Sequence, residues 1–130
     1  MIAVDTSALL AIVLNDPEAD RCAAVLEVAD RLLISAGTVA EALIVAGRRN
    51  VGDEVKRLID GLGFEIISIT PAASRRIAEA YESWGKGIHP AALNFGHCFA
   101  YDVAKQHGCP LLYVGGDFEK TDIEGALPQS

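Results

Sequence analysis

The sequence is short of basic residues, cysteines and long hydrophobic runs. Eleven Lys and Arg residues stand against 18 Asp and Glu residues in the 130-residue chain, which gives a formal net charge of −7 at pH 7. This balance argues against a protein that holds nucleic acid by a broad basic surface, because such a surface needs an excess of Lys and Arg. It leaves open a nuclease that gathers its acids in one pocket and places its bases elsewhere.

The three cysteines and the short apolar runs indicate where the protein works. Cys22, Cys98 and Cys109 have no CxxC or zinc-like spacing, so we expect core residues in a reducing compartment. No apolar run approaches the roughly 18 residues of a membrane span, and Asp5 interrupts the first run too early for a secretory signal. We therefore expect a cytoplasmic protein with no membrane contact, folded as a single domain over residues 1–130.

Hydrophobic periodicity and turn residues predict strands that alternate with helices. The expected strands cover residues 1–4, 31–35, 64–69 and 111–114, and the expected helices cover about 6–14, 17–29, 38–49, 51–62, 71–84 and 91–107. This alternation predicts an α/β fold with a mainly parallel sheet covered on both faces. In such a sheet the ligand site lies beyond the carboxyl ends of the strands.

Acidic residues stand where hydrophobic runs end. Asp5 follows the first predicted strand, Glu41 lies in an apolar helical segment, and Asp117 follows the last predicted strand. Each has a plain explanation alone, as a helix cap, an exposed helical residue or a turn residue. Together they favour a site for a hard divalent cation, because close carboxylates repel one another unless a metal neutralises them. Such a cation can activate water and stabilise the charge that builds on a phosphate during cleavage.

Four segments resemble a known family when they are taken in order. They are residues 2–12 (IAVDTSALLAI), 35–42 (SAGTVAEA), 89–101 (HPAALNFGHCFAY) and 110–118 (PLLYVGGDF), the last followed by Thr121 and Asp122. Over nearly the whole chain they resemble the PIN-domain ribonucleases, and among these the VapC-type toxins of VapBC toxin–antitoxin modules. The resemblance implies a three-layer α/β/α sandwich, a four-acid pocket that binds Mg²⁺ or Mn²⁺, and metal-dependent endonuclease action on RNA. It also implies inhibition by a small VapB-type antitoxin and a homodimer.

The resemblance assigns the site residue by residue. Asp5, Glu41 and Asp117 match three acidic positions, and Thr6 matches the hydroxyl residue that follows the first acid. His97 stands where VapC-type chains have the remaining acid, so we place it in the same pocket as the fourth metal-facing residue. Near neutral pH a histidine supplies one nitrogen ligand, whereas Mg²⁺ prefers oxygen, so we predict a weakened site.

Two neighbouring positions bear on that weakened site. Gly116 stands where the family commonly has Asp or Asn, which removes a possible oxygen ligand beside Asp117. Asp102 is a poor replacement for the missing acid, since five residues along a helix place it about 140° around the axis from His97. Asn94 either orients the loop before the last helix or contacts the metal shell, and Ser7 is expected to cap the first helix.

Two function hypotheses follow, and His97 discriminates between them. The first is a metal-dependent endoribonuclease toxin whose catalytic residues are Asp5, Thr6, Glu41, His97 and Asp117, with activity weakened by His97. The second is a catalytically inactive PIN-fold protein that binds an antitoxin or RNA without cleaving it. A nucleotide-binding or receiver-like module is disfavoured, because no GxGxxG or phosphate loop follows the first strand.

Overall fold

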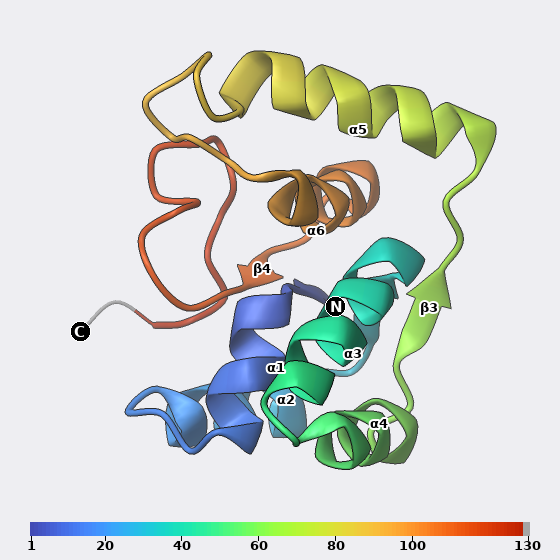
Figure 1. Cartoon of the computed structure of the whole chain (residues 1–130), viewed down its shortest axis with the longest axis vertical. Coiled ribbons are helices and arrows are strands. Elements are labelled where there is room, and N and C mark those ends of the chain that lie inside the picture. Colours follow the sequence, from blue (N-terminus) through green and yellow to red (C-terminus); the bar gives the residue numbers. More distant parts are fainter. Residues whose placement is uncertain (129–130) are drawn as a thin grey trace.

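The computed structural model describes residues 1–128 and contains a four-stranded parallel sheet with helices on both faces (Figure 1). The strands are β1 (Ile2–Val4), β2 (Leu32–Ser35), β3 (Glu65–Ile67) and β4 (Leu111–Leu112), and their spatial order is β3-β2-β1-β4. All three strand pairs are parallel. The predicted α/β class, with its parallel sheet inside an α/β/α sandwich, is confirmed.

The two faces of the sheet pack against different helices. Side chains on successive strand residues point to opposite faces, so Ile2 and Val4 of β1 join one core cluster and Ala3 joins the other. The first cluster packs against α1 (Thr6–Val13), α2 (Ala19–Val28), α3 (Ala36–Arg48) and α4 (Gly52–Gly61). The second packs against α5 (Pro71–Trp84) and α6 (Phe95–His107), which lie together in Figure 1.

Two strands lead directly into capped helices at the edge where the site is expected. Asp5 follows β1 and caps α1, because its side chain accepts a hydrogen bond from the Ser7 N–H group. Ser35 ends β2 and caps α3 through the Gly37 N–H group. The predicted start of α5 is also confirmed, with Thr70 as the cap and Pro71 in the first turn.

Three predicted helix starts are wrong. The third helix begins at Ala36 rather than at residue 38, because Ser35 already caps it. The second helix begins at Ala19 rather than at residue 17, because Pro17 and Glu18 lie in a turn closed by the Ala19 N–H to Asp16 carbonyl bond. The last helix begins at Phe95 rather than at residue 91. Ala92 has a left-handed φ of 52°, which a right-handed helix cannot contain, and Leu93 instead forms a parallel bridge with Gly85.

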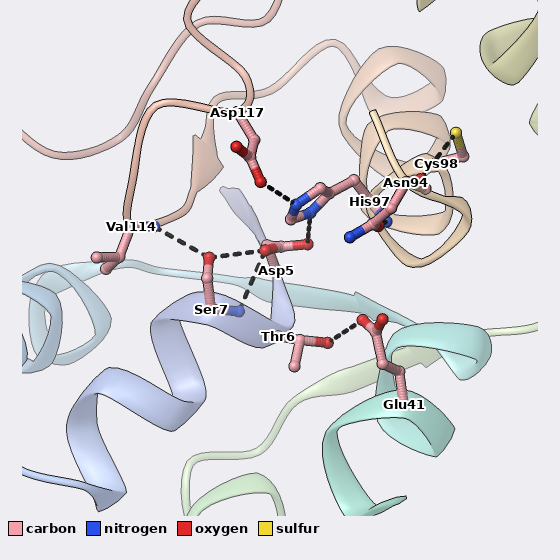
Figure 2. Close-up of polar contacts among 9 residues, drawn as sticks. All are labelled: Asp5, Thr6, Ser7, Glu41, Asn94, His97, Cys98, Val114 and Asp117. Carbon is pink, nitrogen blue, oxygen red and sulfur yellow. Dashed lines mark hydrogen bonds and ion pairs between the residues drawn. The ribbon is translucent and has the colours of Figure 1, made fainter. Parts of the chain in front are cut away.

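The later start of α6 matters for the site. Asn94 caps the helix by accepting a hydrogen bond from the His97 N–H group at 2.8 Å. His97 is therefore held in the first turn of α6, close to the carboxyl edge of the sheet (Figure 2).

Two other expectations concern the cysteines and membrane-spanning helices. Cys22 and Cys98 are buried, Cys109 is partly buried, and all three are free, as predicted for core residues. Among residues 1–128, no helix combines the length and the apolar character that crossing a membrane requires.

Candidate active site

Asp5 is a fully buried carboxylate, and Ser7 holds it in place. Oδ2 of Asp5 accepts hydrogen bonds from the Ser7 N–H group at 3.1 Å and from the Ser7 hydroxyl at 2.7 Å. The Ser7 Oγ in turn accepts a bond from the Val114 N–H group at 3.0 Å. Burial of a charge is unfavourable unless the charge is hydrogen-bonded or paired. These contacts therefore offset the cost of burying the Asp5 carboxylate. They also join the carboxyl ends of β1 and β4.

His97 lies between two of the predicted acids. Its Nδ1 is 3.3 Å from Asp5 Oδ1 and its Nε2 is 2.7 Å from Asp117 Oδ2 (Figure 2). Both acceptors are carboxylate oxygens, so only the imidazolium form, which carries a proton on each nitrogen, satisfies both contacts. Burial of the ring opposes its charge, but the hydrogen bonds and charges of Asp5 and Asp117 outweigh this and raise the pKa of His97 to about 9.

Asp117 is the accessible member of this group. Its side chain is 63% exposed, whereas those of His97 and Asp5 are 13% and 0% exposed. The next residue, Phe118, is buried and packs edge-on against the His97 ring at 4.8 Å between centroids. Phe118 thereby fixes both the loop that carries Asp117 and the plane of the imidazole.

Glu41 and Thr6 form a second pair beside the first group. The Thr6 hydroxyl donates a hydrogen bond of 2.7 Å to Glu41 Oε1. The other oxygen of Glu41 lies against the start of α6: a Cβ atom added to Gly96 would come within 1.8 Å of Oε2. Gly96 therefore leaves the space that Glu41 occupies, one residue before His97. The structure thus gathers Asp5, Thr6, Glu41, His97 and Asp117 at one edge of the sheet (Figure 2).

The donor atoms suit a divalent cation in kind, but their arrangement does not. Three carboxylates and one imidazole are a common ligand set for such ions. Among residues 1–128, however, no three His, Cys, Asp or Glu side chains are placed where they could share one metal ion. The His97 ring is the physical reason, because it occupies the space between Asp5 and Asp117 and supplies the positive charge that these acids need. In this arrangement the His97 ring, rather than a metal ion, bridges Asp5 and Asp117.

Several residues outside this group have structural contacts. Asp102 points away from the site, as predicted, and pairs with Arg76 at 2.7 Å. The His89 ring accepts a hydrogen bond from the Ala91 N–H group at 2.9 Å, in the loop before α6. Trp84 donates its indole N–H to the Tyr101 hydroxyl at 3.0 Å, which joins α5 to α6.

Sequence reasoning missed part of the role of Ser7. Helix capping accounts for its backbone N–H bond to Asp5, but its hydroxyl also connects Asp5 to Val114. No sequence signal marks that second contact, since it depends on how β4 pairs with β1. For Asn94, by contrast, the sequence offers two roles, and the structure shows one of them: its side chain orients the start of α6.

Comparison with known proteins identifies the family of the chain. Residues 2–124 match the PIN domain model. The chain belongs to the PIN-domain family. Two curated PIN-domain relatives come from Mycobacterium tuberculosis: Ribonuclease VapC30 is 38% identical over 130 residues, covering 96% of this chain and 98% of its own, and Ribonuclease VapC36 is 42% identical over 125 residues, covering 93% and 90%.

Solved PIN-domain structures show the same fold at low sequence identity. VapC20 of Mycobacterium tuberculosis, described as a sarcin–ricin loop cleaving toxin, has a TM-score of 0.79 at 16% identity and covers 98% of this chain and 100% of its own. A toxin–antitoxin complex from Klebsiella pneumoniae contains a chain with a TM-score of 0.69 at 18% identity, covering 94% and 93%. At these identities the likeness concerns the fold.

Proposed function

We propose that this protein is a VapC-type endoribonuclease toxin of a type II toxin–antitoxin module. The observation that carries the proposal is the gathering of Asp5, Glu41 and Asp117 at the carboxyl edge of a PIN-domain sheet. Relatives that are named VapC ribonucleases and align over nearly their full length support it. The proposed substrate is single-stranded RNA in the cytoplasm, and the proposed reaction is hydrolysis of a phosphodiester bond.

His97 sets the level of activity in this proposal. The family resemblance points to Mg²⁺ or Mn²⁺ as the cofactor, whereas in this chain an imidazolium already neutralises Asp5 and Asp117. An ion that takes both carboxylates must displace the ring, so binding is weaker than in a site with four acids. We therefore propose a metal-dependent ribonuclease whose activity is low while His97 remains between the two acids.

The proposed protein partner is a VapB-type antitoxin. A basic side chain from such a partner can pair with the exposed Asp117 carboxylate, and that ion pair is strengthened by charge-assisted hydrogen bonding. The relative seen in a toxin–antitoxin complex supports a partner of this kind. We also propose that the toxin forms a homodimer, as the resemblance implies.

Induced expression in a bacterial host tests the proposal. Expression of the wild-type chain should slow growth and generate new RNA 5′ ends, and co-expression of the product of the adjacent small gene should relieve both effects. Asp5→Ala should abolish them, because it removes the buried carboxylate at the centre of the site. Asp60→Ala is the matched control, since Asp60 is an exposed acid on α4 away from the site. Growth arrest that survives Asp5→Ala would contradict the proposal.

A further inference from the structure

The loop that carries Asp117 leaves β4 and returns to it. We call residues 113–123 the Asp117 loop. It is closed at its base, because the Leu111 N–H group donates to the Glu124 carbonyl at 2.9 Å and the Ala126 N–H group donates to the Leu111 carbonyl at 2.8 Å. Asp117 and the two residues before it are exposed. The position of Asp117 therefore depends on how the rest of the loop is attached to the protein.

The chain neighbours of Asp117 fix it only in part. On one side, Phe118 is buried and gives the loop one attachment. On the other side, Gly115 and Gly116 precede Asp117, and glycine has more backbone freedom than any other residue. One buried side chain holds the loop at a single point but leaves its direction free. A second attachment is needed to direct Asp117 towards the candidate active site.

Asp122 provides the second attachment. One of its oxygens accepts a hydrogen bond from the Tyr101 hydroxyl at 2.8 Å, and the other accepts one from the Lys105 ammonium group at 2.9 Å. Trp84 donates its indole N–H to the same hydroxyl, so Tyr101 is itself held in place. The ion pair with Lys105 is half-exposed and adds little to the stability of the fold. We call these two contacts of Asp122 the Asp122 anchor.

Thr121 connects the Asp122 anchor to Phe118. The Thr121 hydroxyl donates a hydrogen bond of 2.7 Å to the Phe118 carbonyl and accepts one of 3.2 Å from the Ile123 N–H group. The Thr121 N–H group donates to the same Phe118 carbonyl at 3.0 Å. Thr121 and Asp122 belong to the sequence resemblance, although neither lies among the site residues. Their contacts place both in the attachment of the Asp117 loop.

The Asp122 anchor and His97 lie on one side of α6. His97, Tyr101 and Lys105 are spaced four residues apart, and side chains at this spacing share one face of an α-helix. His97 contacts Asp117 at one end of this face, while Tyr101 and Lys105 contact Asp122 further along it. The Asp117 loop is therefore attached along the same helix that carries His97 into the site.

We propose that Asp122 is a positioning residue, which holds Asp117 at the candidate active site through its contacts with Tyr101 and Lys105. The inference rests on the proposed ribonuclease function and adds to it a residue outside the site. A ligand at the site competes for the contact of Asp117 with His97. The Asp122 anchor lies apart from that contact, so it keeps the loop in place while the Asp117 carboxylate changes partner.

Amide hydrogen exchange, followed by NMR on the metal-free protein in EDTA, tests the anchor without reference to activity. Asp122→Ala should speed exchange about tenfold at the amides bonded within or from the loop, because a local opening needs fewer contacts to break. These amides are Val114, Glu119 and Thr121. Leu111 and Ala126, which close the base of the loop, should exchange at the wild-type rate. Glu54→Gln is the matched control, since it breaks an exposed ion pair with Arg57 on α4.

Cleavage kinetics in Mn²⁺ test the effect on the site. Asp122→Ala should lower kcat about tenfold and change KM by less than about twofold, because a misplaced carboxylate affects the reaction more than the binding of RNA. Tyr101→Phe and Lys105→Met should each have part of this effect, and the double variant should match Asp122→Ala. Asp122→Asn should lie nearer the wild type, because its amide oxygen still accepts the bond from Tyr101.

The outcomes separate this inference from the function on which it rests. Unchanged exchange in the Asp117 loop of Asp122→Ala would overturn the inference. An equal rise at Leu111 and Ala126 would also overturn it, because Asp122 would then stabilise the whole fold. A raised KM with unchanged kcat would assign Asp122 to RNA binding and exclude the positioning role. If the wild type cleaves no RNA in Mn²⁺, the proposed function falls, while selective release of the loop still supports the anchor.

Discussion

Replacement of His97 by aspartate should change stability and activity in opposite directions. His97 joins Asp5 to Asp117 as a cation, with contacts of 3.3 and 2.7 Å. An aspartate at the same place brings a further negative charge beside two others. Without metal, His97→Asp should therefore be less stable than the wild type. With a divalent ion present, it should bind the ion more tightly and cleave RNA faster.

The size of the stability effect follows from the pKa of His97. A shift from an ordinary value of 6.5 to about 9 makes the folded state more stable by about 2–3 kcal/mol at pH 7, and the substitution removes that contribution. Repulsion from the new carboxylate adds to the loss. In a domain of this size the melting temperature should fall by about 10 °C. A cation present at 100 times its Kd returns about 2.7 kcal/mol, so added ion should recover most of the difference.

Thermal melting and RNA cleavage, each measured with EDTA, Mg²⁺ and Mn²⁺, check this prediction. The cleavage rate of His97→Asp should exceed that of the wild type by about an order of magnitude or more, because stabilisation of developing charge by a metal is worth several kcal/mol. His97→Asn is the control, since it removes the cation without adding an acid. If the wild type already cleaves as fast as His97→Asp, or if His97→Asp melts at the wild-type temperature in EDTA, the account of His97 is wrong.

Three further predictions rest on single contacts. Because the folded-state pKa of His97 is raised, its stabilising effect is complete below pH 6.5 and is lost as the pH rises through about 9. The difference in urea midpoint between the wild type and His97→Asn should therefore shrink as the pH rises over this range. Gly96→Ala should displace Glu41, reduce stability by about 1–3 kcal/mol and abolish cleavage, whereas Gly47→Ala, with open space around it, should do neither. Arg76→Met should destabilise the fold by about 2 kcal/mol by leaving Asp102 unpaired, with cleavage unchanged; a large loss of cleavage would contradict this.

The sequence predicted the framework of the site well because that framework depends on local signals. Asp5 caps the helix after a short apolar strand. This pattern of apolar strand and capping residue can be recognised from neighbouring residues alone. The sequence predicts too early a start for α6 because Ala91, Ala92 and Leu93 are good helix formers. The pairing of Leu93 with Gly85 overrides that propensity, and it is a contact between distant segments.

The arrangement inside the site could not be predicted from the sequence. The resemblance identifies His97 as an altered ligand and predicts that it lines a metal pocket. The structure instead places its ring between two carboxylates, which depends on the distance between the ends of β1 and the loop after β4. The contact of Ser7 with Val114 and the space that Gly96 leaves for Glu41 also depend on packing between distant elements.

Cleavage of single-stranded RNA by the purified protein tests the central claim most directly. The wild type, Asp5→Ala and Asp60→Ala should be prepared identically and assayed side by side in Mn²⁺. The account predicts slow cleavage at defined sites by the wild type and by Asp60→Ala, and at least a hundredfold slower cleavage by Asp5→Ala, because the buried carboxylate that anchors the site is missing. Equal rates for the wild type and Asp5→Ala would contradict the account, because the activity would then not come from this site.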